Sequence, residues 1–309
     1  MSRGEKMEKY VAVIGAVNVD IGGRSFAPLM ARDSNPGSVT MSLGGVGRNI
    51  AHNLRKLSVP VEMLTVLGSD RWADIIEDSC RELGIGLGMA LRAHGERTSS
   101  YLYITGPEGD MELAVCDTDI ARFITPEVIE HNLRALNSAS CVVFDGNLTA
   151  EAIEFIAENV TSPLFADPVS VAKSEKLRPV LGKIHTLKPN LLEAQALTGG
   201  ATAIECAEHF RDIGVRNAFI SDGGRGMTAL SDGEIFALRA YKCRLVNATG
   251  GGDAAMAGLI RSFLDGQSAE ESAKYALAAG SIAVESEETI NPAISDEMIK
   301  RRILEAENE

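Results

Sequence analysis

Near its C-terminus the chain reads Asn247-Ala248-Thr249-Gly250-Gly251-Gly252-Asp253-Ala254-Ala255, and an alanine-rich run with helical patterning continues to residue 264. Three consecutive glycines let a ligand approach the backbone closely. The free N–H groups in the first turn of the helix would point at such a ligand, and the helix dipole adds about half a positive charge there. The stretch therefore predicts an anion hole formed by Gly250, Gly251 and Gly252.

An aspartate follows this glycine turn directly. Asp253 would bring negative charge towards a bound anion, which is unfavourable if the site only holds phosphate. It is favourable if the carboxylate takes a proton from an attacking hydroxyl while the anion hole stabilises the charge on a transferred phosphoryl group. Asp253 is therefore the candidate catalytic base.

Two other interpretations of the glycine turn stay open. Asp253 could simply cap the helix. The stretch also matches G-x-G-x-x-A, a fingerprint of dinucleotide-binding folds, but the acids about 20 residues further on, Glu270 and Glu271, fall in a predicted helix and not at a strand end. The Walker pattern GxxxxGK[ST] does not occur in the sequence, so a P-loop enzyme is excluded.

Upstream of this turn, short apolar runs alternate with helical patterns. Buried strands are predicted at residues 11–17, 61–67, 141–144, 164–166, 184–187 and 218–221. Helices are predicted at residues 47–57, 72–83, 150–158, 191–197, 251–264, 269–284 and 295–305. The alternation favours an α/β fold in which helices cover both faces of a parallel sheet.

Two regions interrupt that alternation. Residues 38–43 have the pattern of a half-exposed strand, and residues 99–105 and 111–115 form two more alternating runs joined by the turn-forming stretch at 106–110. These pieces are expected to be antiparallel. We expect a single domain over residues 1–309, with a small β-sheet lid formed by parts of about 20–44 and 97–117.

Two polar motifs fall near the first predicted strand and helix. Gly44-Gly45-Val46-Gly47-Arg48-Asn49 precedes a helix, so its backbone could receive a hydroxylated ligand, with Asn49 reaching in from the first turn. Asn18 and Asp20 follow the first strand, and ligands bind at the carboxyl ends of parallel strands. This pair could clamp the vicinal hydroxyls of a sugar. A plain strand-to-helix turn and a turn-forming Asn and Asp remain the alternatives.

Three smaller features lie in the second half of the chain. Asn190, which follows Lys188 and Pro189 after a strand, is well placed to cap the next helix, and Glu193 could hold hydrated magnesium near phosphates. The glycine turn at residues 221–226 suits nucleotide phosphates or a simple hairpin. Lys173 could reach a polar substrate group or remain solvated.

Composition limits the kinds of protein to consider. The 309 residues include 43 acidic and 30 basic side chains, a net charge of −13, and the resulting mean field would repel nucleic acid. No apolar run approaches the roughly 20 residues of a membrane helix, and the first ten residues lack the apolar core of a secretory signal. The five cysteines form no CxxC pair, which disfavours a zinc site or a disulfide framework. We expect a cytoplasmic protein that binds neither nucleic acid nor membrane.

Taken in order, these motifs resemble those of the ribokinase-like (PfkB) family of carbohydrate and nucleoside kinases. Residues 44–49 and 247–253 are similar to the two signatures of the family; Asn18 and Asp20 come before the first signature, and the stretch 188–193 lies between the two. The resemblance covers nearly the whole chain, from residue 11 to about residue 295. It implies a Rossmann-like α/β/α core with a β lid, the use of ATP and Mg²⁺, and often a homodimer joined through the lids.

The resemblance also implies roles by motif position. Asp253 would be the base, and Gly250, Gly251 and Gly252 would form the anion hole with it. The substrate would be held by Asn18, Asp20, Gly44, Gly45 and Asn49. ATP would be bound by Asn190, Ser221, Gly223, Gly226 and Thr249, and Glu193 would hold Mg²⁺ through water.

Within this family the chain most resembles the pseudouridine kinases. Four stretches carry the similarity, at residues 42–51, 116–120, 167–173 and 286–292. The implied reaction moves the γ-phosphoryl group of ATP to the 5′-hydroxyl of pseudouridine, and Lys173 would meet the base or its surroundings. A kinase for another nucleoside or for ribose, and a non-catalytic nucleotide sensor on the same fold, are the alternatives.

The second signature departs from the family pattern at two positions. It commonly begins with Asp, but here the residue is Asn247, and Gly251 stands where Ala is usual. In ribokinase the first position helps to hold a monovalent cation, so the resemblance leaves a requirement for K⁺ open.

Overall fold

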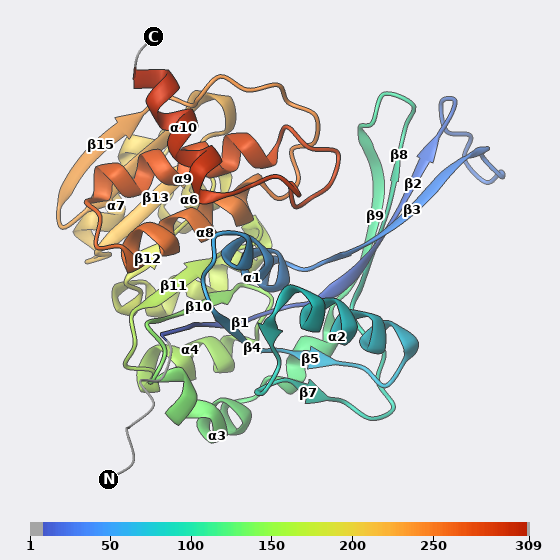
Figure 1. The fold of residues 1–309 in the computed structure, drawn as a ribbon, viewed down its shortest axis with the longest axis horizontal. Helices are drawn as coiled ribbons and strands as arrows, with labels where there is room; N and C mark the ends of the chain where they lie inside the picture. Colours follow the sequence, from blue (N-terminus) through green and yellow to red (C-terminus); the bar gives the residue numbers. More distant parts are fainter. Residues whose placement is uncertain (1–8, 308–309) are drawn as a thin grey trace.

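A nine-stranded sheet runs through the centre of the computed structural model, which describes residues 9–307 (Figure 1). The strand order is β15-β14-β13-β12-β11-β10-β1-β4-β6. Seven neighbouring strands are parallel: β1 (Val11–Ile14), β4 (Val61–Leu64), β6 (Ile85–Gly86), β10 (Cys141–Asp145), β11 (Leu164–Asp167), β12 (Thr186–Leu187) and β13 (Asn217–Ser221). At one edge, β14 (Met227–Ser231) and β15 (Glu234–Leu238) add antiparallel strands.

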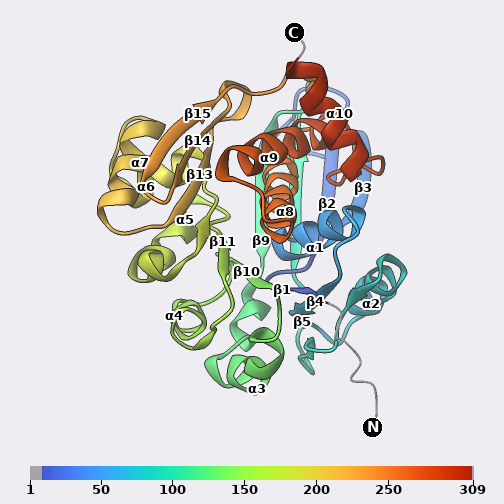
Figure 2. The same ribbon diagram turned by 60° about the vertical axis from the view of Figure 1, so that its left-hand side comes forward.

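Helices cover both faces of this sheet, as Figure 2 shows. One face carries α1 (Val46–Lys56), α2 (Arg71–Leu83), α8 (Gly251–Leu264), α9 (Ala269–Ala283) and α10 (Asp296–Glu307). The other carries α3 (Pro126–Leu136), α4 (Ala150–Asn159), α6 (Leu191–Thr198) and α7 (Ala203–Asp212), with the short α5 (Val171–Ser174) nearby. Short 3-10 helices lie at Asp119–Phe123, Glu175–Lys183 and Gly223–Arg225.

Two hydrophobic cores, one on each side of the sheet, show why the strands are apolar throughout. Successive side chains of a strand point to opposite faces. In β1, Val11 and Val13 therefore pack into the core that contains α1, α8 and α9. Ala12 and Ile14 pack into the core that contains α4, α6 and α7. The expected three-layer α/β/α architecture is confirmed.

A second, four-stranded sheet projects from this core (Figure 1). Its strands, in the order β3-β2-β8-β9, are β3 (Gly37–Gly44), β2 (Asn18–Ser25), β8 (Ser100–Thr105) and β9 (Met111–Asp117). The pairs β2–β3 and β8–β9 are antiparallel, while β2 and β8 are parallel. We call these four strands the small sheet. The antiparallel pieces expected from the alternating patterns are present, and β2 begins only four residues after β1 ends.

Some predicted elements differ from the structure. The strand expected at residues 61–67 is split at Thr65, whose hydroxyl donates to the Gly15 carbonyl at 2.7 Å, and the following β5 (Val66–Leu67) pairs with β7 (Leu91–Arg92) in a separate two-stranded sheet. The expected parallel sheet is in fact mixed, because the unpredicted strands β14 and β15 pair antiparallel at its edge. Helices α3 and α7 were also not predicted. Within residues 9–307, the structure contains no helix long and apolar enough to span a membrane.

Candidate active site

Polar residues collect at the carboxyl ends of the central strands. Asp145 is the last residue of β10 and Asp167 the last of β11, and these two residues are register partners. Lys188 and Asn190 follow β12, and Asn18 follows β1. The N-termini of α1 and α8 lie at the same edge, since Asn49 of α1 contacts Asp253 of α8. This is the edge at which an open parallel sheet binds its ligands.

The glycine turn before α8 has the backbone geometry that an anion hole needs. Gly250 is the N-cap of the helix and has a left-handed conformation with φ of 84°, which favours glycine. A side chain at Gly250 would overlap the Thr289 carbonyl. In the described part of the chain, no hydrogen bond reaches the backbone N–H groups of Gly251, Gly252 and Asp253. These donors are therefore available to a ligand.

Asp253 lies in the first turn of α8 with its carboxylate directed across to α1. Its Oδ2 accepts a hydrogen bond from the side-chain amide of Asn49 at 2.9 Å, and part of the residue stays accessible. Burial and the nearby Asp167 raise the pKa of Asp253 to about 7, although Asn49 and Lys188 act in the opposite direction. A carboxyl with this pKa can accept a proton near neutral pH. Gly250, and not Asp253, occupies the N-cap position, so the interpretation of Asp253 as the helix cap is wrong.

The dinucleotide-binding interpretation of the same stretch is also wrong. That fingerprint requires a strand directly before the glycines. Here β15 ends at Leu238, and residues 239–249 form an irregular segment. Leu245 and Val246, just before the turn, are exposed and belong to no strand.

The motif residues near the N-terminus form a second polar group around Asp20. The side-chain amide of Asn18 donates to Asp20, and a side chain at Gly44 would overlap the Asp20 carboxylate. Burial raises the pKa of Asp20 to about 6, while Arg48 and Asn18 favour its charged form. Asn18 and Asp20 belong to β2, so the interpretation of these residues as turn formers is wrong.

Gly45 and Asn49 complete this group. Gly45 is the N-cap of α1 with φ of 96°, and a side chain there would overlap the Ala16 carbonyl. Asn49 is buried, and its Oδ1 has no hydrogen-bond partner within the described residues. Because a buried polar atom is costly to leave unpaired, the free Oδ1 is suited to accept a hydrogen bond from a substrate hydroxyl. The amide nitrogen of the same side chain holds Asp253, so Asn49 joins the two groups.

Asn190 and Glu193 form a capping box at the start of α6. The Asn190 side chain accepts from the Glu193 N–H, and the Glu193 carboxylate accepts from the Asn190 N–H, both at 2.9 Å. The expected capping role of Asn190 is confirmed. Burial and Asp167 raise the pKa of Glu193. One carboxylate oxygen, Oε2, is used in the capping box.

The glycine turn at residues 221–226 is a hairpin between β13 and β14. Gly223 and Gly226 have positive φ, and Asp222 forms an ion pair with Arg225 at 2.7 Å. Ser221 forms an isolated bridge with Asn190, so the hairpin lies next to the start of α6. Thr249 lies in the exposed segment before α8, and its N–H donates to the Asn247 side chain at 2.9 Å. The hairpin interpretation is confirmed, and it does not conflict with phosphate binding.

Sequence reasoning missed Asp145, which is fully buried and organises the centre of the site. Its Oδ2 accepts from the N–H groups of Ala16 and Gly47 at 2.9 and 3.0 Å. Its Oδ1 accepts from the backbone and the side chain of Asn147. The Asn147 side chain in turn accepts from Lys173 Nζ at 2.5 Å. One carboxylate thus ties the end of β1 to the start of α1 and to Lys173. The sequence did contain a signal for this residue: Asp145 directly follows the strand predicted at residues 141–144, where ligand-binding side chains are expected.

The small sheet presents a second missed feature beside Asp20. The register places Asp20, Tyr101 and Cys116 in one row across β2, β8 and β9. Tyr103, two residues along β8 on the same face, lies over Gly22, and the rings of Tyr101 and Tyr103 are 5.7 Å apart. Two aromatic rings therefore share the face of the small sheet that carries Asp20.

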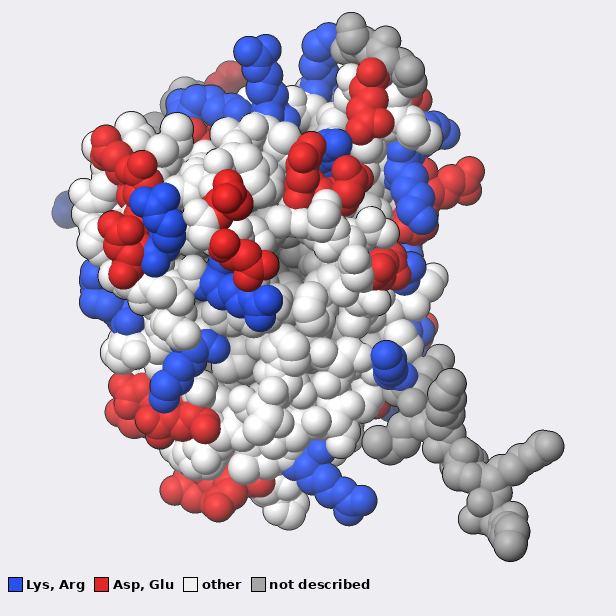
Figure 3. Space-filling view, turned by 90° about the vertical axis from the view of Figure 1, so that its left-hand side faces the viewer, with Lys and Arg blue, Asp and Glu red and all other residues white. Residues whose placement is uncertain are grey.

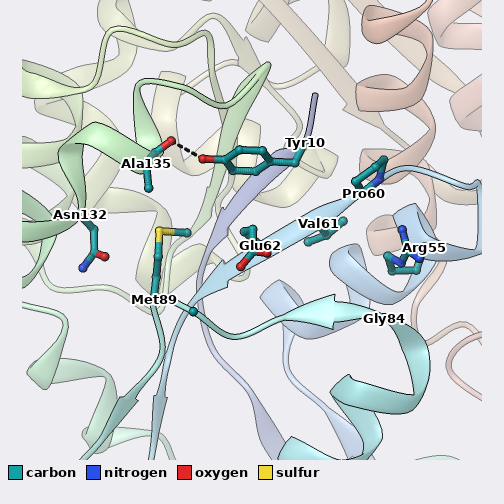
Figure 4. A pocket seen from close by; sticks show the side chains of 10 residues that line it. Tyr10, Arg55, Pro60, Val61, Glu62, Gly84, Met89, Asn132 and Ala135 are labelled. Carbon is teal, nitrogen blue, oxygen red and sulfur yellow. Dashed lines mark hydrogen bonds between the residues drawn. The ribbon is translucent and has the colours of Figure 1, made fainter. Parts of the chain in front are cut away.

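A pocket lies at the opposite edge of the sheet. Figure 4 shows this pocket, with a volume of about 750 Å³. Tyr10 and Pro60 directly precede β1 and β4, so they mark the amino ends of these strands. The Tyr10 hydroxyl donates to the Ala135 carbonyl at 2.6 Å, and Glu62 and Met89 also line the space. None of the residues predicted to act on substrate or ATP lines this pocket.

Charge is not segregated on the face turned to the left in Figure 1. Figure 3 shows this face with acidic and basic side chains intermixed. The net charge of −13 therefore does not produce a single acidic surface there. Any binding of anionic phosphates has to rely on local groups such as backbone N–H donors.

Comparison with known proteins agrees with this geometry. The family model described as pfkB family carbohydrate kinase matches residues 8–296. The chain is 38% identical to a pseudouridine kinase of Escherichia coli over 294 residues, which cover 93% of this chain and 94% of the relative. It is 36% identical to a protein of the same bacterium named uncharacterized sugar kinase YeiI, with 93% and 82% of the two chains covered.

A solved structure agrees at the level of the fold. The Arabidopsis thaliana ribokinase complexed with ribose and ATP superimposes with a TM-score of 0.84 over 96% of this chain and 99% of that one, at 21% identity. The ribokinase-like architecture is thereby shown, with the glycine turn, the strand-end carboxylates and the small sheet on one chain. The protein therefore belongs to the pfkB family of carbohydrate kinases, which are phosphotransferases with an alcohol acceptor.

Proposed function

We propose that this chain transfers the γ-phosphoryl group of ATP to the 5′-hydroxyl of pseudouridine. The observation that carries the proposal is the placement of Asp253. Part of the residue is accessible, its carboxyl has a pKa raised to about 7 by burial and Asp167, and it adjoins backbone N–H groups that have no partner among the described residues. A base beside an anion hole is what phosphoryl transfer to a hydroxyl requires.

In the proposed reaction each part of the glycine turn has one task. Asp253 accepts the proton of the attacking hydroxyl. The N–H groups of Gly251, Gly252 and Asp253 donate hydrogen bonds to the oxygens of the phosphoryl group in transfer. Gly250 allows the backbone to turn so that these donors face the ligand. The side-chain amide of Asn49 holds the carboxylate in one orientation.

Sugar recognition is assigned to the group around Asp20. Asp20 and Asn18 supply a carboxylate and an amide, and the absence of side chains at Gly44 and Gly45 lets the backbone lie close to Asp20 and to the Ala16 carbonyl. The free Oδ1 of Asn49 is the acceptor for a further hydroxyl. Lys173, held by Asn147, is assigned to the base or its surroundings. The choice of pseudouridine is supported by the 38% identity to the pseudouridine kinase of E. coli.

ATP is assigned to the side of the site that lies beyond β12. Asn190, Ser221, Gly223, Gly226 and Thr249 would line it. Magnesium fits here only indirectly, because the described residues hold no group of three or more His, Cys, Asp or Glu side chains able to bind a metal. Glu193, whose Oε2 is already used in the capping box, would contact the ion through water. Bound Mg²⁺ supplies neutralisation of phosphate charge.

A potassium site does not fit the residues present. The Asn247 side chain uses its oxygen to accept from the Thr249 N–H and its nitrogen to donate to the Glu287 carbonyl at 3.1 Å. A cation needs oxygen atoms with free lone pairs, and here an N–H donor faces the carbonyl. We therefore derive no step that uses a monovalent cation.

The small sheet is proposed to act as a lid within a single kinase domain, and to join two chains in a homodimer. One face carries Asp20, Tyr101 and Tyr103. The register places an apolar row on the other face, and its exposed members are Val39, Met41, Leu102, Leu113 and Val115. An exposed apolar patch of this kind is typical of an interaction surface. A second copy of the chain is the occupant we propose.

A nucleoside panel tests the proposed substrate. Purified protein is incubated with ATP, Mg²⁺ and pseudouridine, uridine, guanosine, inosine or ribose, and the monophosphates are measured by mass spectrometry. We expect the highest kcat/KM with pseudouridine and a kcat about 10²–10⁴-fold lower in the Asp253→Asn variant. Absence of pseudouridine turnover would exclude the proposed substrate.

A sugar or another nucleoside is the second candidate substrate, favoured by the 36% identity to the sugar kinase of E. coli. Product from ribose or from another nucleoside, without product from pseudouridine, would identify it. ATP binding without any product would instead indicate a nucleotide sensor on the same fold.

A further inference from the structure

A buried ion pair lies directly behind the glycine turn and has no part in the steps described above. Lys188 Nζ is 3.1 Å from Asp167 Oδ2, and the two residues are only 4% and 5% exposed. The backbone N–H of Lys188 donates a hydrogen bond to the Ala166 carbonyl at 3.1 Å. This bond holds the lysine backbone at the end of β11.

The lysine ammonium reaches the first turn of α8. A Cβ atom at Gly252 would lie 3.3 Å from Lys188 Nζ, so the charge sits against the backbone of the anion hole. Although burial alone would lower it, the pKa of Lys188 is raised by Asp167, Glu193 and Asp253. Lys188 is therefore the cation for three carboxylates from three different elements.

The charges that act on Asp253 come from a few elements. Asp167 and Asp145, at the ends of β11 and β10, raise its pKa in addition to burial, and Lys188 lowers it. From α1 the contact is the neutral amide of Asn49. The part of α9 that lies against this turn is uncharged, with Gly280 next to the Gly251 carbonyl. Lys188 is thus the one basic group in this set.

Stability alone does not account for such a pair. Removing two charges from water is costly, and a buried ion pair is often replaceable by apolar side chains without loss of stability. An electrostatic task in the site gives the pair a reason to be there. Besides its partner Asp167, the anions next to Lys188 are Glu193, Asp253 and any bound phosphate, and of these Asp253 is the one proposed to accept a proton.

We propose that Lys188, oriented by Asp167, is a positioning residue that keeps Asp253 in its charged, proton-accepting form among the neighbouring carboxylates. This inference rests on the proposed role of Asp253 as base and extends it to a residue pair that does not touch the transferred group. Without the ammonium, Asp253 would share a poorly solvated edge with Asp145 and Asp167 and would hold its proton at neutral pH.

A titration that needs no substrate tests the inference. Protein labelled with ¹³C at the aspartate carboxyl carbons is titrated by NMR, and the Asp253 signal is assigned by its loss in Asp253→Asn. In Lys188→Met the midpoint of Asp253 should move up by about 1–3 pH units, as expected for loss of a nearby opposite charge. In Asp167→Asn it should move down. Lys183→Met, which removes a lysine that is 49% exposed, should leave the midpoint unchanged.

The double variant Asp167→Asn/Lys188→Met guards against unfolding, because the single Lys188 variant leaves Asp167 buried and unpaired. Removing both charges should return the midpoint close to that of the unchanged protein. A folded Lys188→Met protein whose Asp253 midpoint stays within about 0.3 units would overturn the inference, because a lost neighbouring charge must shift it further. If Lys188→Met does not fold, a double variant with a midpoint well above that of Asp167→Asn supports it, and equal midpoints overturn it.

Turnover gives a second readout. On the substrate identified by the panel, Lys188→Met should be impaired at pH 7 and recover towards pH 9, as Asp253 loses its proton. A purely structural role would lower turnover equally at all pH values, which would contradict the inference. The NMR shift without turnover of pseudouridine would refute the proposed substrate and leave the role of Lys188 standing. Turnover of pseudouridine without the NMR shift would support the proposed substrate and refute the role of Lys188.

Discussion

The side-chain amide of Asn49 donates a hydrogen bond to the carboxylate of Asp253 at 2.9 Å, although the two residues are 204 positions apart in the chain. Asn49 stands at the start of α1 and Asp253 at the start of α8, so the bond joins the N-termini of two helices. The same Asn49 side chain keeps an unpaired oxygen. A hydroxyl bound by that oxygen would lie close to the base that is proposed to deprotonate a substrate.

Replacing the base should abolish most turnover. Asp253→Asn keeps the shape of the side chain but cannot accept a proton, and general-base catalysis typically contributes about 10²–10⁴-fold. We expect kcat to fall by that factor while KM for the nucleoside changes little. Steady-state kinetics with matched circular dichroism spectra checks this. Turnover within about threefold of the unchanged protein would be incompatible with a base that contributes that factor.

The same substitution should stabilise the protein at alkaline pH. Because the pKa of Asp253 is raised to about 7 in the folded state, the native protein binds more protons than the unfolded chain between about pH 4 and pH 7. The stability that this group contributes is present at low pH and is lost as pH rises to 7. Asp253→Asn should therefore melt at a higher temperature than the unchanged protein at pH 8 and at a similar temperature at pH 4. Thermal unfolding at both values tests the sign, and a lower melting temperature at pH 8 would contradict it.

Gly250→Ala should reduce stability and turnover more than a matched glycine substitution at Gly266. Both Gly250 and Gly266 have positive φ, so alanine at either position costs about 1–2 kcal/mol of backbone strain. At Gly250 the new methyl would also overlap the Thr289 carbonyl, whereas nothing lies within 4 Å at Gly266. We expect Gly266→Ala to lose a few degrees of melting temperature and keep its kinase activity. Gly250→Ala should lose more stability and most turnover, and equal effects in the two variants would argue against a constrained turn.

Turnover should not depend on potassium. The side-chain amide of Asn247 already donates a hydrogen bond to the Glu287 carbonyl, so this carbonyl does not need a cation as its partner. Replacing KCl by tetramethylammonium chloride at constant ionic strength should leave kcat unchanged. In Asn247→Asp a carboxylate would face that carbonyl, so turnover should fall without potassium and recover when it is added. A strong dependence of the unchanged protein on potassium would refute this account.

Charges placed on the apolar face of the small sheet should separate a dimer. Met41 and Val115 are 62% and 59% exposed and lie in one row of the sheet. We expect a dimer in sedimentation velocity that becomes a monomer in Met41→Glu/Val115→Glu. Ile204→Glu, an apolar-to-acidic change at an exposed position of α7, is the control and should stay dimeric. A monomer without any substitution would exclude the proposed assembly.

Features encoded by local pattern could be predicted from the sequence. The helix expected at residues 251–264 is α8 with identical bounds, because the glycines and the alanine-rich run mark both its start and its character. The strand that became β2 was missed, since Gly22 and Gly23 weaken the pattern of residues 18–25. Without that strand, the sequence pattern fitted Asn18 and Asp20 as turn-forming residues as well as it fitted them as sugar-binding residues.

Features that depend on contacts between distant segments could not be predicted. A single aspartate after a buried strand, such as Asp145, has the same local pattern whether it faces solvent or accepts four hydrogen bonds. The pairing of Lys188 with Asp167 follows from the neighbouring positions of β11 and β12 in the sheet, which the sequence order alone does not fix. The raised pKa of Asp253 depends on Asp145 and on the pair of Lys188 and Asp167, so it could be derived only from the structure.

The strand that carries Asn18 and Asp20 is a direct outgrowth of the central sheet, since β2 leaves the core only four residues after β1. Any movement of the small sheet must therefore also move the carboxylate of Asp20, which we propose binds the sugar. In the proposed mechanism, binding of the sugar to Asp20 and closure of the small sheet are one event, so a molecule that does not bind Asp20 would leave the small sheet open. On the same proposal, water would not trigger closure of the small sheet, and bound ATP would be protected from hydrolysis.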